Sequence, residues 1–220
     1  MAEYQTTTRS TNESLLATHK VLRNTYMLLG LTLLFSAFTA FASMAVGLGH
    51  GVAMIMSFAA IGIVWFVLPR TENKPSGLVW TFVFTGLLGA GLGPMLNVYL
   101  AVMPGVVFQA LAGTAVIFFT LSAYTLITRS DFSFMGGALM VGIVVAFVIS
   151  ILGLVFQMPM MNLVASGLFM LVSSGMILFQ TSQIIHGGET NYIRATVTLY
   201  VSIYNLFVSL LHILGVMSDD

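Results

Sequence analysis

The stretch ILFQTSQIIHGGETNYIRATVTLYVSIYNLFVSLLHILG, from Ile177 to Gly215, decides the fold of this chain. It reads as two apolar helices joined by a short polar turn. In the second helix, polar side chains recur every three or four residues and so line one face: Arg194, Thr198, Ser202, Asn205, Ser209 and His212. A polar stripe inside a membrane span needs protein or water around it. We therefore predict that the last helix lies inside a bundle formed by the earlier helices.

The composition of the whole chain is that of a membrane protein. Apolar residues make up 58% of the 220 residues and charged residues only 6%, whereas soluble domains carry roughly 25% charged residues. The seven basic and seven acidic side chains cancel, so no net charge favours nucleic acid as a partner. The absence of cysteine excludes disulfides, thiolate nucleophiles and Cys-based metal sites.

Seven apolar segments, each near the roughly 20 residues that cross a bilayer, predict an all-α protein with seven transmembrane helices. The predicted membrane domain, 21–217, contains spans at about 25–46, 52–68, 77–101, 105–128, 135–155, 161–185 and 194–216. Residues 1–20 hold few large apolar side chains and predict an N-terminal tail, mobile over its first dozen residues. A capping-box pattern from Ser10 to Glu13 indicates the start of a juxtamembrane helix that runs into the first span.

Charged residues occur only in the two tails and in the connections after the second, fourth and sixth spans. With seven spans every basic residue lies on one side of the membrane: Arg9, Lys20, Arg23, Arg70, Lys74, Arg129 and Arg194. The positive-inside rule makes that side cytoplasmic, which places the N-terminus in the cytoplasm and the C-terminus in the periplasm. Six or eight spans would scatter these residues over both faces. The first apolar run lacks a signal-peptide cleavage pattern and is expected to be retained.

The third predicted span carries two packing signals. Small residues recur every four positions, and Gly89 and Gly93 form a GxxxG pattern that lets helix backbones approach closely. Pro94 removes a backbone hydrogen bond in mid-membrane, so we expect a kink or a short unwound piece at Gly93 and Pro94. Tight helix packing is the favoured interpretation, and a permeation path is the alternative. The first span repeats the pattern with Thr32, Ser36, Thr39 and Ser43.

The polar turn between the last two spans has the residues that cap helices. Gly187 and Gly188 suit the C-terminal end of the sixth helix, and Thr190 or Asn191 suits the start of the seventh. Arg194 is expected to reach the cytoplasmic interface, which avoids the few kcal/mol that a charge in mid-membrane costs. We favour this structural role over a functional one.

Metal binding and catalysis find little support in the sequence. His186 and Glu189 lie three residues apart, but the two glycines between them make a turn, so capping is favoured over a ligand pair. The spans contain no HExxH motif, no pair of aspartates and no serine in a GxSG setting. We expect no metal, no cofactor and no enzymatic activity.

Two further polar features lie on the last two spans. His212 is 18 residues beyond Arg194, about 27 Å along a helix, which places it near the outer interface as a hydrated histidine or, alternatively, a pH sensor. Gln180 and Ser202 lie about 9 and 12 Å from the turn, so they can face one another at similar depth. Interhelical hydrogen bonds of this kind contribute about 0.6 kcal/mol on average and fix packing.

The segment GGETNYIRATVTLYVSIYNLFVSLLHILG, the seven spans, THKVLRNTY before the first span and GLGPMLN in the third together resemble the Bax inhibitor-1 family, and most closely its bacterial YccA-like branch. The resemblance implies six helices surrounding a central seventh and an inner-membrane location. It also implies modulation of the membrane-anchored protease FtsH, whose degradation of membrane substrates this branch restrains. A pH-sensitive cation leak, chiefly of calcium, is the alternative activity that it implies.

One departure from the family pattern separates these two activities. The leak depends on a pair of acids in the last two spans, and matching the motifs places Gln180 and Ser202 at those positions. Neither side chain ionises, so neither switches charge between pH 5 and 8. This argues against a charge-gated calcium leak and favours the FtsH modulator, whose role in the branch is attributed to the cytosolic tail and the membrane domain.

Overall fold

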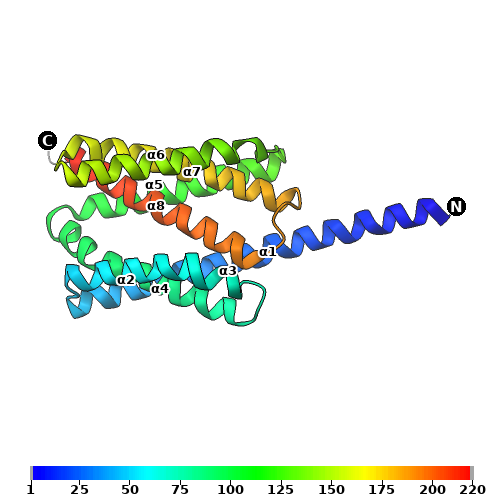
Figure 1. Ribbon diagram of the computed structural model, residues 1–220, viewed down its shortest axis with the longest axis horizontal. Helices are drawn as coiled ribbons and strands as arrows, with labels where there is room; N and C mark the ends of the chain where they lie inside the picture. The colour runs from blue at the N-terminus through cyan, green and yellow to red at the C-terminus, as the bar shows by residue number, and fades with distance from the viewer. Residues whose placement is uncertain (1, 219–220) are drawn as a thin grey trace.

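The computed structural model describes residues 2–218, with side chains for residue 16 and residues 18–218, and this range contains only helices and their connections (Figure 1). Seven stretches are long and apolar enough to cross a membrane, which confirms the predicted all-α fold with seven spans. The elements are α1 (Ala2–Val46), α2 (His50–Gly62), the π-helical turn η1 (Ile63–Val67), α3 (Leu68–Thr71), α4 (Ser76–Val102), α5 (Pro104–Thr128), the 3₁₀ turn η2 (Ser133–Met135), α6 (Gly136–Val155), α7 (Pro159–Ile185) and α8 (Tyr192–Ser218).

Proline marks the boundaries of several helices. Pro104 and Pro159 open α5 and α7, where the first turn leaves its N–H groups unpaired in any case. The second span is built from α2, η1 and α3, and its π-helical turn lies directly before Pro69. Pro69 has no backbone N–H, so a carbonyl oxygen in the preceding turn loses its usual hydrogen-bond donor. The wider π-helical turn accommodates this loss.

The helices form two groups with α8 running obliquely between them (Figure 1). One group contains α1, α2 and α4, and the other contains α5, α6 and α7. No residue from Ala195 to Gly215 is exposed, as predicted for a helix inside a bundle. The expectation that six helices surround it is not confirmed, because α8 contacts only α1, α4, α5 and α7 among the described residues. The remaining two pack on the outside, α2 against α4 and α6 against α7.

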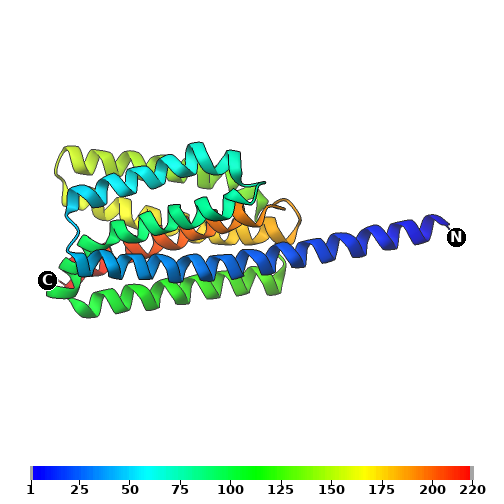
Figure 2. The same cartoon turned by 90° about the horizontal axis from the view of Figure 1, so that it is seen from below.

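The first helix continues far beyond the bundle. It runs unbroken from Ala2 to Val46, and its N-terminal part projects away from the other helices (Figures 1 and 2). The expected juxtamembrane helix therefore does run into the first span, but it begins before the Ser10–Glu13 pattern. That pattern is not the N-terminal cap, because a capping residue leaves the helical conformation and the backbone here does not. The side chains of Ser10 and Glu13 lie outside the described residues.

The small-residue ridge of α4 packs against α1 at very short range. A Cβ added at Gly89 would collide with the carbonyl oxygen of Ser36, and one added at Gly93 would collide with the hydroxyl of Ser43. Only glycine leaves room for this approach, so the favoured interpretation of the GxxxG pattern as a packing motif describes the contact.

Pro94 does not unwind α4, which stays helical from Ser76 to Val102. Because proline has no N–H, the carbonyl oxygen of Ala90 loses its partner within the helix. The hydroxyl of Ser43 on α1 donates to this oxygen at 2.7 Å and replaces the missing bond. The expected unwound piece is therefore absent, and a kink at Gly93 and Pro94 stays a prediction.

Candidate functional site

The candidate site is the turn between α7 and α8 together with the polar residues that continue from it into the bundle. The turn begins at Gly187, whose φ of 76° is in the left-handed region that favours glycine. The N–H of Glu189 then donates to the Gln183 carbonyl at 3.0 Å. At Gly188 a Cβ would collide with the Gln183 side chain. His186 Nδ1 lies 2.9 Å from the Ser182 carbonyl oxygen, so this imidazole bonds to the end of its own helix.

Asn191 caps the start of α8. Its Oδ1 accepts hydrogen bonds from the backbone N–H of Ile193 at 2.9 Å and of Arg194 at 3.2 Å, which pairs two of the donors that open a helix. Its own N–H donates to Glu189 Oε1 at 2.8 Å. Its amide nitrogen donates to the Glu72 carbonyl at 3.1 Å, so the cap also ties α8 to the connection between α3 and α4.

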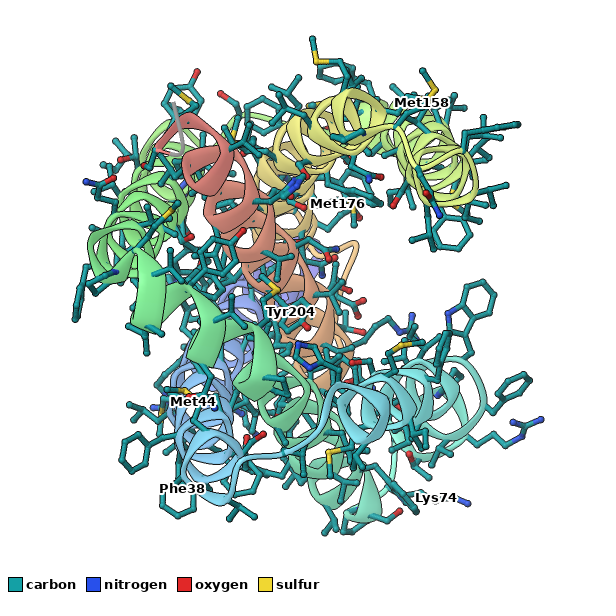
Figure 3. The ribbon with its side chains drawn as sticks, turned by 90° about the vertical axis from the view of Figure 1, so that its left-hand side faces the viewer. Phe38, Met44, Lys74, Met158, Met176 and Tyr204 are labelled. Atoms are coloured by element: carbon teal, nitrogen blue, oxygen red, sulfur yellow. The ribbon has the colours of Figure 1, made fainter. Side chains whose placement is uncertain are left out.

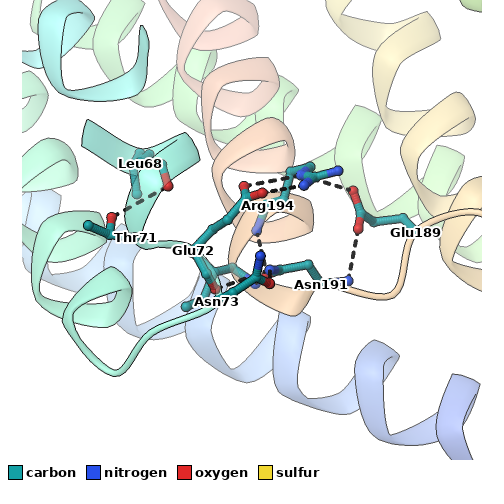
Figure 4. Close-up of polar contacts among 8 residues, drawn as sticks. Leu68, Thr71, Glu72, Asn73, Glu189, Asn191 and Arg194 are labelled. Atoms are coloured by element: carbon teal, nitrogen blue, oxygen red, sulfur yellow. Dashed lines mark hydrogen bonds and ion pairs between the residues drawn. The ribbon is translucent and has the colours of Figure 1, made fainter. Parts of the chain in front are cut away.

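Arg194 is placed between two carboxylates (Figure 4). Its Nε lies 3.1 Å from Glu72 Oε2 and 3.9 Å from Glu189 Oε2, and its NH2 also bonds to Glu72. The arginine side chain is 56% exposed, whereas those of Glu72 and Glu189 are 11% and 12% exposed. A cation in the first turn of a helix is disfavoured by the helix dipole, and the two acids at the same end offset that effect.

Glu72 was missed by sequence reasoning. The signal for it was present, because the connection PRTENKPS and the turn HGGETNY both follow even-numbered spans and so lie on one face. The sequence pattern does not show that Glu72 pairs with Arg194. Only the fold brings the acid of one connection to the base that follows the other.

The connection between α5 and α6 joins the same end of the bundle. The N–H of Phe132 donates to Ser182 Oγ at 2.9 Å, and Gln183 Nε2 donates to Ser133 Oγ at 2.8 Å. Hydrogen bonds from Ser133 hold the pKa of the exposed Asp131 carboxyl below its ordinary value. All three connections that carry charge therefore gather around the ends of α7 and α8.

Gln180 and Ser202, which the sequence analysis matched to the family acid positions, are buried, but no hydrogen bond joins them in the described part of the chain. Ser202 Oγ donates to the Thr198 carbonyl of its own helix at 2.8 Å, the common bond of serine within helices. Gln180 is 5% exposed, and its Nε2 has no partner among the described atoms. That the two side chains face one another stays a prediction.

The C-terminal part of the polar stripe of α8 contacts polar residues of α7. His212 Nδ1 lies 2.8 Å from Ser166 Oγ, which connects α8 to α7. Asn205, Ser209 and His212 line a cavity of 370 Å³ together with Asn162 and Ser166. Thr198 and His212 are partly exposed, whereas Ser209 is buried. The histidine is therefore bonded within the bundle and lines a small cavity whose walls are both polar and apolar.

Two tyrosines that sequence reasoning did not single out also hold the helices together. The Tyr200 hydroxyl donates to the Thr85 carbonyl at 3.2 Å and shares a 2.6 Å hydrogen bond with Ser36 Oγ, so one side chain joins α8, α4 and α1. The Tyr26 hydroxyl bonds to Ser122 on α5. A buried tyrosine hydroxyl needs a partner, and that need was the available signal. Figure 3 shows the neighbouring Tyr204 in the middle of the bundle.

Comparison with known proteins gives consistent matches over this whole region. The family model described as "Inhibitor of apoptosis-promoting Bax1" matches residues 18–219. A relative from Escherichia coli K12 named "Modulator of FtsH protease YccA" is 55% identical over 208 residues, 94% of each chain. An E. coli CFT073 relative with the same identity and coverage is named "Inner membrane protein YccA". A Vibrio cholerae relative, named as an uncharacterized membrane protein, is 50% identical over 216 residues, 97% of each chain.

Proposed function

This chain belongs to the Bax inhibitor-1 family, and from that premise we propose that it is a non-enzymatic inner-membrane protein that restrains degradation of membrane proteins by an FtsH-type protease. The observation that carries the proposal is the 55% identity, over 94% of the chain, to the E. coli relative named as a modulator of FtsH protease. The relative named as an inner membrane protein supports the location.

The proposed orientation has the N-terminus in the cytoplasm and the C-terminus in the periplasm. Its support is the gathering of the charged connections at one end of the bundle, through the Glu72–Arg194 ion pair and the Phe132–Ser182 hydrogen bond. The N-terminal part of α1 leaves the bundle at that same end (Figure 1). Basic residues there fit the cytoplasmic side of a membrane.

In the proposed mechanism the protease engages the projecting N-terminal segment of α1, about residues 1–20, while the bundle resists extraction. The backbone of this segment extends away from the other helices (Figure 1). The bundle itself is fastened by the close α1–α4 packing, by Tyr200 and by the ion pair at Arg194. The protein then occupies the protease without being degraded, and other membrane substrates are spared.

The test is the turnover of an FtsH membrane substrate in cells that produce either the full chain or a variant lacking residues 2–15. The full chain should lengthen the substrate's half-life, and the truncated variant should not. A control variant carries a Gly/Ser segment of equal length in place of residues 2–15, and equal membrane levels of all three proteins are checked. Restraint by the truncated variant equal to that of the full chain would refute the proposed role of the N-terminal segment.

The cation leak is the second candidate, and the residues at its gate weaken it. Gln180 and Ser202 carry no ionisable group, so they supply no charge switch. Calcium and proton flux into liposomes would be compared for the wild type and the Gln180→Asp/Ser202→Asp variant at about pH 6 and about pH 8, the range in which histidine titrates. A pH-dependent leak of the wild type would restore this candidate and direct attention to His212.

A further inference from the structure

The end of α5 lies near the place where α1 leaves the bundle (Figure 2). A cavity of 630 Å³ opens there between residues of the two helices. Its lining includes the basic residues His19, Lys20 and Arg23 of α1. It also includes the apolar residues Leu16 and Leu22 of α1 and Leu126 of α5. The segment proposed to contact a protease ends at about residue 20, so it shares Leu16, His19 and Lys20 with this cavity, whereas Leu22, Arg23 and Leu126 lie outside it.

The two cations are placed to act together. Lys20 and Arg23 are three residues apart in one helix and so lie on the same face. Both are exposed, and among the described residues neither forms an ion pair. Leu16, one helical turn before Lys20 on the same helix, is 70% exposed, so its side chain is open to a ligand at this place.

Tyr26 of α1 also lines the cavity and contacts two other helices. The Tyr26 hydroxyl bonds to Ser122 Oγ on α5 and lies 3.4 Å from Thr181 Oγ1 on α7. The ring of Tyr26 also lies 6.2 Å from that of Phe118. The side chains of Tyr26, Ser122 and Phe118 therefore join α1 to α5, two helices whose described Cα atoms nowhere come within 8 Å of one another. Tyr26 thus ties this end of α1 to α5 and α7 next to the cavity.

We propose that this pocket binds the phosphate headgroup of an anionic phospholipid, with Lys20 and Arg23 contacting the phosphate and the leucines contacting the first acyl carbons. The charge of the pocket selects an anion, and a basic pocket at the membrane boundary attracts anionic lipids. The adjoining leucines select a lipid over a free anion, since dissolved phosphate has no apolar part to cover them. The bound lipid fixes α1 at the point where it leaves the bundle.

Native mass spectrometry of the purified full chain in detergent, titrated with phosphatidylglycerol, tests the proposal. The Lys20→Gln/Arg23→Gln variant should bind the first lipid about 30-fold more weakly, because each basic residue near an anionic lipid contributes about a fivefold change in affinity. The matched control is Arg70→Gln/Lys74→Gln, which removes one arginine from α3 and one lysine from the connection between α3 and α4 and should leave the affinity unchanged. The Lys20→Arg/Arg23→Lys variant keeps both charges and should retain binding.

Three outcomes would overturn the proposal. Equal weakening in the two neutralised variants would mean that the lipid responds to diffuse surface charge. Equal affinity of the wild type for phosphatidylglycerol and for phosphatidylcholine, which carries no net charge, would remove the anion from the argument. Displacement of the lipid by inorganic phosphate alone would assign the pocket to a free anion. None of these readouts depends on the protease, so failure here and failure of the proposed function are distinguishable.

Discussion

The hydrogen bond from Ser43 to the Ala90 carbonyl replaces the one that Pro94 cannot make. This compensation can be tested by mutation. Replacing Ser43 by alanine leaves the carbonyl oxygen unpaired inside the α1–α4 interface. An unsatisfied buried group costs about 1–3 kcal/mol in soluble proteins, and interhelical bonds in membranes contribute about 0.6 kcal/mol on average with a maximum near 1.7. We therefore expect Ser43→Ala to lower the free energy of unfolding by about 1 kcal/mol, roughly a fivefold change in the unfolding constant.

The decisive comparison is made in a second background. Pro94→Ala supplies an N–H that bonds to Ala90 within α4, so the Ser43 hydroxyl is no longer needed. In that background Ser43→Ala should cost almost nothing, and the coupling between the two positions should equal nearly the whole effect. Unfolding by sodium dodecyl sulfate in mixed micelles, followed by circular dichroism, gives the four free energies.

A control isolates the compensating bond from the loss of any serine hydroxyl. Ser174 Oγ donates at 2.8 Å to the Met170 carbonyl in its own helix, an oxygen that the helix already pairs, so Ser174→Ala should change stability by less than about 0.5 kcal/mol. The reasoning is refuted if Ser43→Ala costs the same with proline and with alanine at position 94. Additivity would mean that Ser43 stabilises the interface without replacing a missing backbone bond.

Three further predictions concern the same bundle. Gly89→Ala should destabilise it by about 1–3 kcal/mol because of overpacking against Ser36, whereas Gly30→Ala, whose Cβ meets nothing within 4 Å, should not destabilise it in the same micelle unfolding assay. Ser36→Ala should cost about 1 kcal/mol by removing its hydrogen bond to Tyr200, and Tyr200→Phe should cost more because it also removes the bond to the Thr85 carbonyl; in a double-mutant cycle the double variant should cost no more than Tyr200→Phe alone. Asn191→Ala should cost about 0.5–2 kcal/mol through loss of the cap, measured by thermal unfolding, with faster amide exchange confined to the first turn of α8.

The positions of the seven spans were readable from the sequence because a bilayer forces every backbone polar group into a helix. The third span was expected at about residues 77–101 and is α4, Ser76–Val102. The single largest difference lies at the N-terminus, where polar residues were read as a tail and the backbone is helical from Ala2. The composition of a segment shows whether it has apolar residues to bury in a core. A helix that continues outward from a membrane span does not need such residues, so a polar composition does not exclude it.

The pairing of helices was not readable in the same way. Burial of α8 follows from its polar stripe, but all the helices are apolar enough to occupy either an inner or an outer place. The outer positions of α2 and α6 therefore depend on shape and on connection geometry. Likewise, the sequence offers Glu72, Glu189 and Arg194 on one face, and the ion pairs among them appear only once α3 and α8 are placed.

The unbroken α1 also determines how the protein responds to mechanical load. No proline interrupts residues 2–46, and α1 is one continuous helix from Ala2 to Val46. A force applied at Ala2 is therefore transmitted along this helical rod to the α1–α4 interface. Force along the rod loads that interface in shear, and the interlocked small residues must slip together. A pull across the rod would open the same interface as a zipper, one turn after another. Direction of pulling, and not only its strength, therefore sets how readily this bundle can be dismantled from its N-terminus.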